Sequence, residues 1–105
     1  MSEGLDRLFA TIAARKDADP AASYTAKLLA AGVETCAKKF GEEATETVIA
    51  AIQKDKVELA RESADVLYHL AVLWAASGIT PEDVYAVLKA REAMSGLEEK
   101  AGRKG

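Results

Sequence analysis

The sequence predicts an all-α protein that forms one domain. It is rich in Ala, Leu, Glu and Lys, which favour helix over strand, and contains only seven Gly and two Pro in 105 residues. Apolar residues recur every three or four positions in several segments, and capping residues precede these segments. We therefore expect roughly four to five helices within residues 1–93. A polar, partly disordered tail is expected from residue 94 to 105.

Two helices are predicted in the first third of the chain. Ser2 can cap the first helix, and the run from 17 to 20 ends it, since Asp and Pro favour turns. The apolar face of this helix consists of Leu5, Leu8, Phe9 and Ile12. A shorter helix should follow, capped by Ser23 or Thr25 and stopped by Gly32.

A long helix is predicted from about Val33 to Gln53. Its apolar face is formed by Ala37, Phe40, Ala44, Val48 and Ala51. Its acidic side carries Glu42, Glu43 and Glu46. Because Ile49 and Ala50 lie on this acidic side one turn further on, we expect the acids to face a second packed surface. Gly41 costs about 1 kcal/mol relative to Ala, which suggests a close approach by backbone or ligand.

Two more helices complete the predicted fold. Asp55 begins the first in a pattern like a capping box, and Gly78 ends it. Its near-apolar run, residues 66–76, is shorter than the roughly 20 residues that span a bilayer, so we expect a core helix. Thr80 and Pro81 open the last helix. The apolar stripe of that helix consists of Val84, Val87 and Leu88.

Charge and cysteine content limit the partners and the compartment. The formal net charge of −3 gives no general attraction for nucleic acid or for an anionic membrane, so we expect neither as a partner. The single cysteine, Cys36, has no partner for an internal disulfide, and the first residues lack a signal-peptide pattern. A cytoplasmic location is therefore expected.

Four acids form two pairs at helical spacing, Glu43 with Glu46 and Glu62 with Asp65. Apolar segments typical of buried helices follow both pairs, and clustered acids in a water-poor interior cost several kcal/mol per uncompensated charge. A bound cation is the simplest compensation. Mg²⁺ prefers oxygen ligands and is often shared with substrate phosphates, whereas zinc and iron sites favour His or Cys, and His69 is the only histidine. The pattern thus predicts Mg²⁺-assisted hydrolysis of a phosphoanhydride.

Structural explanations compete with several of these assignments. Glutamates at this spacing often form a solvated helix face, and Lys38 and Lys39 are better explained by surface ion pairs. The hydroxyls around Ser23 favour a helix cap over a phosphate-binding loop. We prefer a satisfied core histidine for His69 over an orienting partner of the acids, and Tyr68 suits either the core or a nucleotide base.

Three segments together resemble a known enzyme family. They are residues 23–29 (SYTAKLL), 39–46 (KFGEEATE) and 62–69 (ESADVLYH). The spacing of the two acid pairs, Glu43 with Glu46 and Glu62 with Asp65, resembles that of the all-α MazG-type nucleoside triphosphate pyrophosphohydrolases. The flanking residues resemble, more narrowly, the phosphoribosyl-ATP pyrophosphohydrolase family, and the likeness extends from about Leu5 to Arg91. Phe40 stands where an aliphatic residue is more usual in that family. We expect this difference to affect packing more than chemistry.

The resemblance implies a MazG-like helical bundle completed by homodimerisation. It also implies Mg²⁺-dependent hydrolysis of phosphoribosyl-ATP to phosphoribosyl-AMP and pyrophosphate, the second step of histidine biosynthesis, with water attacking the α–β phosphoanhydride. The implied metal ligands are Glu43, Glu46, Glu62 and Asp65. The implied catalytic acids are Glu42, Glu43 and Glu46, with Glu42 orienting water or ligand. The implied substrate contacts are Ser23, Tyr24, Thr25, Lys27 and Lys39. The stand-alone form of the enzyme is expected.

Two other functions remain open at this point. One is a MazG-like house-cleaning enzyme that hydrolyses non-canonical nucleoside triphosphates. The other is a non-catalytic helical dimerisation module whose acids only solubilise an exposed face. Comparing the turnover of phosphoribosyl-ATP with that of a panel of triphosphates distinguishes the house-cleaning enzyme from the phosphoribosyl-ATP enzyme. Replacing Glu46 or Asp65 by Ala distinguishes the non-catalytic module, which predicts little change in any metal-dependent property.

Overall fold

The computed structural model describes residues 3–93, which form five helices and contain no strand. These are α1 (Glu3–Ala14), α2 (Tyr24–Ala31), α3 (Val33–Ile52), α4 (Lys56–Ser77) and α5 (Pro81–Glu92). The predicted all-α fold is confirmed. The expected cap at Ser2 and the expected tail from 94 to 105 lie outside the described residues.

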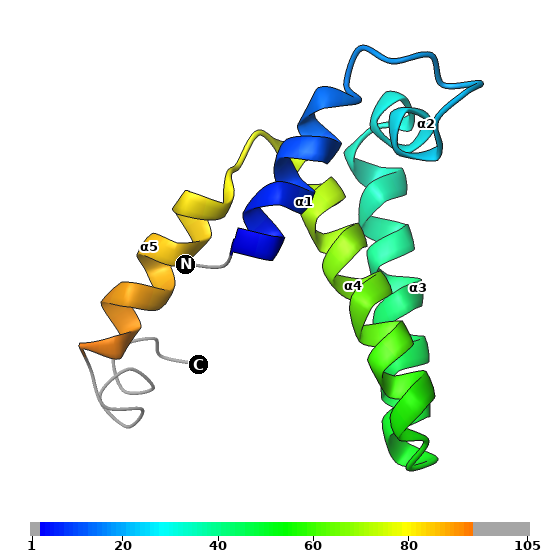
Figure 1. Cartoon of the computed structure of the whole chain (residues 1–105), viewed down its shortest axis with the longest axis vertical. Helices are drawn as coiled ribbons and strands as arrows, with labels where there is room; N and C mark the ends of the chain where they lie inside the picture. Colours follow the sequence, from blue (N-terminus) through cyan, green and yellow to red (C-terminus); the bar gives the residue numbers. More distant parts are fainter. Residues whose placement is uncertain (1–2, 94–105) are drawn as a thin grey trace.

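The long helices α3 and α4 form an antiparallel hairpin around which the other helices are arranged (Figure 1). The first helix, α1, packs against α4, and α2 packs against both helices near one end of the hairpin. The last helix, α5, diverges from the hairpin and contacts mainly α1. The turn that joins α3 to α4 therefore extends beyond the rest of the fold (Figure 1). No helix in the described part of the chain has both the length and the apolar content to cross a bilayer.

The core lies where α1, α2, α3 and α4 meet. Its fully buried members are Ile12, Leu28, Cys36, Ala71 and Val72. Leu8 and Phe9 pack against this cluster, which confirms the predicted apolar face of α1. The Cys36 thiol donates to the Leu28 carbonyl over 3.3 Å, so the cysteine serves as a packing residue.

The predicted helix ends are confirmed in detail. Ser23, not Thr25, caps α2, since its Oγ accepts a hydrogen bond from the Ala26 amide. Asp55 caps α4 in the same way, and Thr80 opens α5 with a reciprocal capping box. Each such cap stabilises the fold by about 1 kcal/mol. Gly78 ends α4 with a φ of +79°, a left-handed conformation that favours glycine.

The apolar residues along the hairpin are more exposed than the sequence led us to expect. Val48, Ile49, Ile52, Val57 and Leu67 have between 48% and 74% of their surface accessible. The expectation of a buried segment after the acids is therefore wrong within one chain for residues 47–52, where only Ala50 is buried. It is largely confirmed for residues 66–76, where His69, Ala71, Val72 and Trp74 are buried. The physical reason is that α3 packs on α4 through the side that carries Cys36, Glu43 and Ala50, so Val48 and Ala51 of its predicted apolar face point outward.

Two further expectations about packing differ from the structure. Val87 and Leu88, on the predicted apolar stripe of α5, are 51% and 42% exposed because α5 leaves the hairpin. At Gly41, an added Cβ would meet no atom of the described residues within 4 Å. The close approach expected at this glycine is therefore not made within the described part of the chain.

Candidate active site

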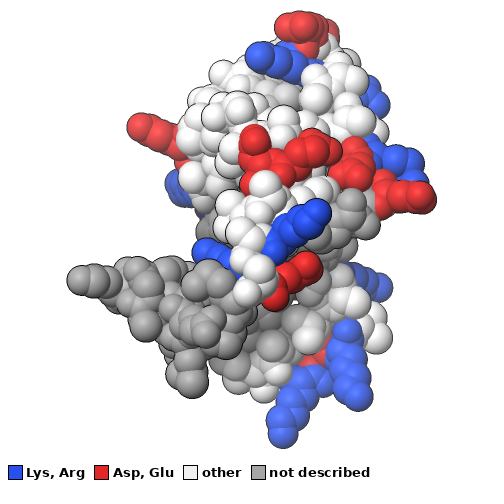
Figure 2. Space-filling model, turned by 90° about the vertical axis from the view of Figure 1, so that its left-hand side faces the viewer, with Lys and Arg blue, Asp and Glu red and all other residues white. Residues whose placement is uncertain are grey.

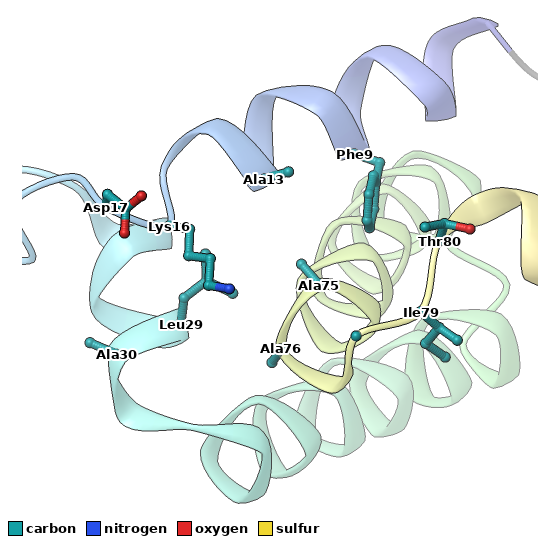
Figure 3. A pocket seen from close by; sticks show the side chains of 11 residues that line it. Phe9, Ala13, Lys16, Asp17, Leu29, Ala30, Ala75, Ala76, Ile79 and Thr80 are labelled. Atoms are coloured by element: carbon teal, nitrogen blue, oxygen red, sulfur yellow. The ribbon is translucent and has the colours of Figure 1, made fainter.

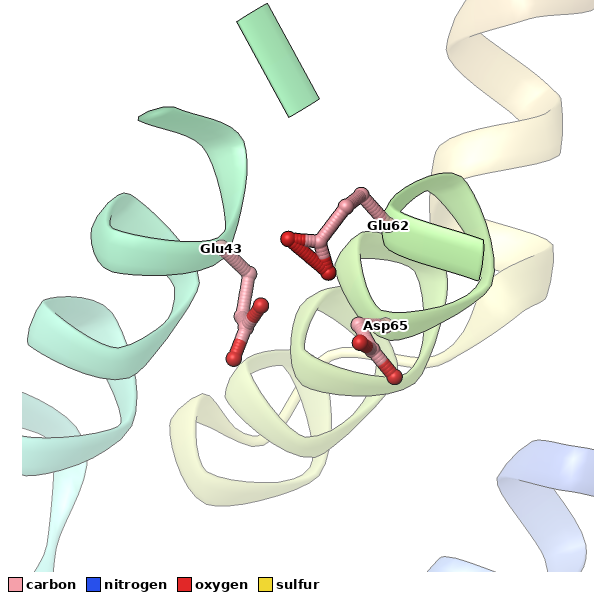
Figure 4. A group of neighbouring side chains, drawn as sticks. All are labelled: Glu43, Glu62 and Asp65. Atoms are coloured by element: carbon pink, nitrogen blue, oxygen red, sulfur yellow. The ribbon is translucent and has the colours of Figure 1, made fainter. Parts of the chain in front are cut away.

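Three of the predicted acids converge between the two long helices. Glu43 projects from α3 toward Glu62 and Asp65 of α4 (Figure 4). One carboxylate oxygen from each residue lies within 4.8 Å of the others. Glu62 and Asp65 share a helix face because they are three residues apart. We call these three residues the acid cluster.

The helix register explains why the acid cluster faces inward. Cys36, Glu43 and Ala50 are spaced by one heptad and share one side of α3. The flanking Cys36 and Ala50 are buried, so Glu43 is held between them on the packed side of the helix. The prediction that the acids face a second packed surface is confirmed for Glu43.

Glu46 and Glu42 lie beside the acid cluster and not within it. Glu46 is exposed, yet its carboxyl interacts with those of Glu43 and Glu62. Glu42 pairs with Lys39, whose Nζ lies 3.5 Å from Glu42 Oε1 on the surface. Such exposed pairs contribute about 0–1 kcal/mol, which agrees with the ion-pair interpretation of Lys39.

Mutual repulsion and burial alter the acidity of the cluster. The pKa of Glu62 rises from 4.5 to about 7, chiefly because burial disfavours its charged form and next because of the Glu46 charge. The pKa of Glu43 is also raised, first by its hydrogen bond with the Glu46 carboxyl and then by burial. Acidic side chains also form a visible band across one face of the molecule (Figure 2). Without a cation, Glu62 is therefore partly protonated near neutral pH.

Two observations fit a hard divalent cation at the acid cluster. The donor set consists entirely of carboxylate oxygens, the ligands that Mg²⁺ prefers. In addition, Glu43 Oε2 is buried and lacks a hydrogen-bond partner in the described part of the chain. A buried acceptor without a partner is costly, and a bound cation or its water would satisfy it.

His69 is buried beside the acid cluster. It is 6% exposed, and its Nε2 lies 4.0 Å from Oε1 of Glu43. The rings of Tyr68 and Tyr24 meet it edge-on, with centroid distances of 5.0 and 6.3 Å. Burial lowers the pKa of His69, which favours the neutral imidazole. His69 is a core histidine as expected, but not a satisfied one, because Nδ1 has no hydrogen-bond partner among the described residues.

Four of the five predicted substrate contacts, Ser23, Tyr24, Thr25 and Lys27, gather at the first turn of α2, whereas Lys39 lies on α3. Tyr24 is 54% exposed, Lys27 is also exposed, and the Thr25 hydroxyl lies 2.5 Å from that of Tyr68. A shallow open pocket at this turn is lined by Pro20, Ala21, Ala22, Ser23, Tyr24 and Lys27. Tyr68 and His69 thus join this turn to the acid cluster. The sequence alone does not assign either residue to the site, although both lie one helical turn after Asp65, which is the signal that could have identified them.

A separate cavity of about 460 Å³ lies near the C-terminal end of α4 (Figure 3). Its lining includes Phe9 and Ala13 of α1, Leu29 of α2, and Ala76, Ile79 and Thr80 around the end of α4. None of the predicted site residues lines this cavity. The acid cluster and this cavity are therefore distinct features of the fold.

Comparison with known proteins agrees with this arrangement. The family model "Phosphoribosyl-ATP pyrophosphohydrolase" matches residues 5–92. Proteins named phosphoribosyl-ATP pyrophosphatase are similar along almost the whole chain. The one from Parvibaculum lavamentivorans is 64% identical over 99 residues, covering 94% of this chain and 91% of the relative. One from Cereibacter sphaeroides is 61% identical over 99 residues, covering 94% and 96%. One from Azospirillum brasilense is 57% identical over 100 residues, covering 95% and 90%. The chain therefore belongs to the phosphoribosyl-ATP pyrophosphohydrolase family.

Proposed function

We propose that this chain hydrolyses phosphoribosyl-ATP to phosphoribosyl-AMP and pyrophosphate, the second step of histidine biosynthesis. Water attacks at the α–β phosphoanhydride. Membership of the family supports the substrate. The observation that carries the chemistry is the convergence of Glu43, Glu62 and Asp65 within 4.8 Å between two helices. The biosynthetic family and the single cysteine also support a cytoplasmic location.

The acid cluster is proposed to hold Mg²⁺, with Glu46 as a fourth acid at its edge. When bound, Mg²⁺ stabilises charge that develops on the pyrophosphate leaving group and favours ionisation of water. A bound cation would relieve the repulsion among the three carboxylates, and it would favour the ionised forms of Glu43 and Glu62, whose pKa values are raised in its absence. Glu46 is exposed beside the cluster and is the acid best suited to accept a proton from the attacking water. Glu42 stands one helix position from Glu43 and would orient water or ligand.

The first turn of α2 is proposed to bind the nucleotide. Lys39 supplies positive charge beside Glu42, and the exposed Lys27 supplies it at the turn. An anionic substrate requires such local charge in a chain of net charge −3. The exposed ring of Tyr24 offers an apolar face, and Ser23 and Thr25 fix the backbone of this turn through their hydrogen bonds. The substrate would thus lie between this turn and the acid cluster.

A homodimer is proposed to cover the outward face of the hairpin. Exposed apolar or small residues recur at helical spacing along α3 and α4, and this face is defined by Ala37, Gly41, Val48, Ile52, Val57, Ala60, Ala64 and Leu67. Such spacing suits helix packing against a second hairpin, and Gly41 would allow a close approach. The radius of gyration, 15.8 Å, exceeds the roughly 13 Å of a compact domain of this size, which also favours a partner. Residues 1–93 would form the pyrophosphohydrolase domain of each protomer.

Substrate preference provides the direct test. The purified chain is mixed with phosphoribosyl-ATP, or with each of a panel of canonical and non-canonical triphosphates, and pyrophosphate release is followed with and without Mg²⁺. Strong preference for phosphoribosyl-ATP is expected, with loss of turnover in a chelator. Equal turnover of ordinary triphosphates would instead indicate a house-cleaning enzyme. Full activity after both Glu46→Ala and Asp65→Ala would contradict the site.

A further inference from the structure

His69 lies where core packing alone would not require a histidine. It is the polar residue that the described part of the fold buries most, and it sits between the acid cluster and the two tyrosines. A leucine or phenylalanine could fill such a position without the cost of burying two ring nitrogens. We therefore look for a hydrogen bond of the imidazole that would explain a histidine at this position.

The unpaired carboxylate oxygen of Glu43 beside His69 supplies that explanation. Nδ1 of His69 and Oε2 of Glu43 are both buried without a hydrogen-bond partner among residues 3–93. The distance from Nε2 of His69 to Oε1 of Glu43 is 4.0 Å, which is too long for a hydrogen bond. The ring is confined by Tyr68 and Tyr24, whereas Glu43 can change its side-chain torsions. A small change in the Glu43 side-chain torsions would bring a carboxylate oxygen within hydrogen-bond distance of Nε2, whereas Nδ1 takes no part in this contact.

We propose that His69 is a positioning residue whose Nε2–H donates a hydrogen bond to Glu43 and holds that carboxylate in the orientation that binds the cation. The inference rests on the proposed Mg²⁺ site. A carboxylate has two oxygens, so one can hold the cation while the other accepts the hydrogen bond. Such supporting hydrogen bonds orient ligands, and their loss commonly weakens metal binding about 10- to 100-fold.

Mg²⁺ binding to the metal-free, full-length protein tests this role without any substrate. Calorimetric titration would compare the wild type with His69→Leu, which removes the donor, and with His69→Gln, whose amide can reach Glu43. We expect binding about tenfold weaker for His69→Leu and restored to within about threefold by His69→Gln. Val72→Ala is the matched control, because Val72 is a buried α4 residue outside the site. It should lower the melting temperature and leave Mg²⁺ affinity unchanged.

Nuclear magnetic resonance gives a second readout, since the chain has a single histidine. Long-range proton–nitrogen correlation should show the proton on Nε2, with the Nε2 signal shifting when Mg²⁺ is added. A proton on Nδ1 would overturn the proposal, as would equal Mg²⁺ affinity of the wild type and folded His69→Leu.

Two outcomes keep the test decisive. If His69→Leu fails to fold, His69→Gln is compared with His69→Asn, whose shorter amide should not reach Glu43, and equal affinities would refute the role. If the wild type itself does not bind Mg²⁺, the proposed metal site is wrong. If the wild type binds Mg²⁺ and replacement of His69 does not change the affinity, only the role of His69 is wrong.

Discussion

The hydroxyl of Thr25 lies 2.5 Å from the hydroxyl of Tyr68, which joins the first turn of α2 to the middle of α4. The two residues are 43 positions apart in the chain. Since Tyr68 also packs against His69, this contact fixes the proposed nucleotide-binding turn relative to the acid cluster. It links the two halves of the candidate site through side chains alone.

Tyr68→Phe should therefore weaken substrate binding more than chemistry. The ring and its packing remain, but the Thr25 hydroxyl loses its partner, at a cost of about 1 kcal/mol in folding free energy. We expect KM for phosphoribosyl-ATP to rise severalfold with kcat nearly unchanged, measured by steady-state kinetics. Tyr85→Phe is the control, because its hydroxyl donates to Asp6 away from the site. An equal rise of KM in both variants would show that the contact has no special role.

The contribution of Glu62 to the stability of the metal-free protein should fall as pH rises from about 4.5 to about 7. Glu62 has a pKa raised to about 7 in the fold, against 4.5 for its ordinary value. Below 4.5 both folded and unfolded states hold the proton, whereas between these values only the unfolded chain releases it, which favours unfolding. Thermal melting in a chelator would measure the trend.

Glu62→Gln should flatten this dependence, since the glutamine does not titrate. Its melting temperature in a chelator should exceed that of the wild type above pH 7. Glu92→Gln, which changes the charge equally at an exposed position near the end of α5, serves as control. Parallel pH profiles for the wild type and Glu62→Gln would mean that Glu62 does not carry the effect.

Magnesium should stabilise the wild type and not Asp65→Ala. A ligand that binds only the folded state stabilises it by about 2.7 kcal/mol at a concentration 100 times its dissociation constant. Removal of Asp65 leaves two members of the acid cluster and should greatly reduce this gain. Differential scanning calorimetry with increasing Mg²⁺ would test it, with Ca²⁺ for comparison. An undiminished shift in Asp65→Ala would place the cation elsewhere.

Local signals in the sequence were enough to predict the helices. Ser23, Asp55 and Thr80 each begin a helix, and Gly32 and Gly78 each end one, because caps depend on residues only a few positions apart. The pairing of Glu43 with Glu62 and Asp65 was also within reach, since acids on apolar helices suggest a shared face.

Packing between distant segments was harder to predict. The sequence predicts an apolar stripe through Val48, but within one chain α3 presents its Cys36 side to the core. Periodicity shows that two faces differ and does not show which one a neighbour covers. For the same reason the roles of Tyr68 and His69 stayed open, since both depend on α2 lying beside α4.

A charge on the outward face of the hairpin should break the proposed dimer. Val48 is 56% exposed in the single chain, and Val48→Glu would bury an uncompensated carboxylate if a second hairpin covers it. We expect sedimentation velocity to show a wild-type dimer and a variant of half that mass. Ala10→Glu, an equally charged change at an exposed position of α1, should remain dimeric. A wild type that sediments as an 11.1 kDa monomer would rule out the dimer, and a dimeric Val48→Glu would place its interface on another face.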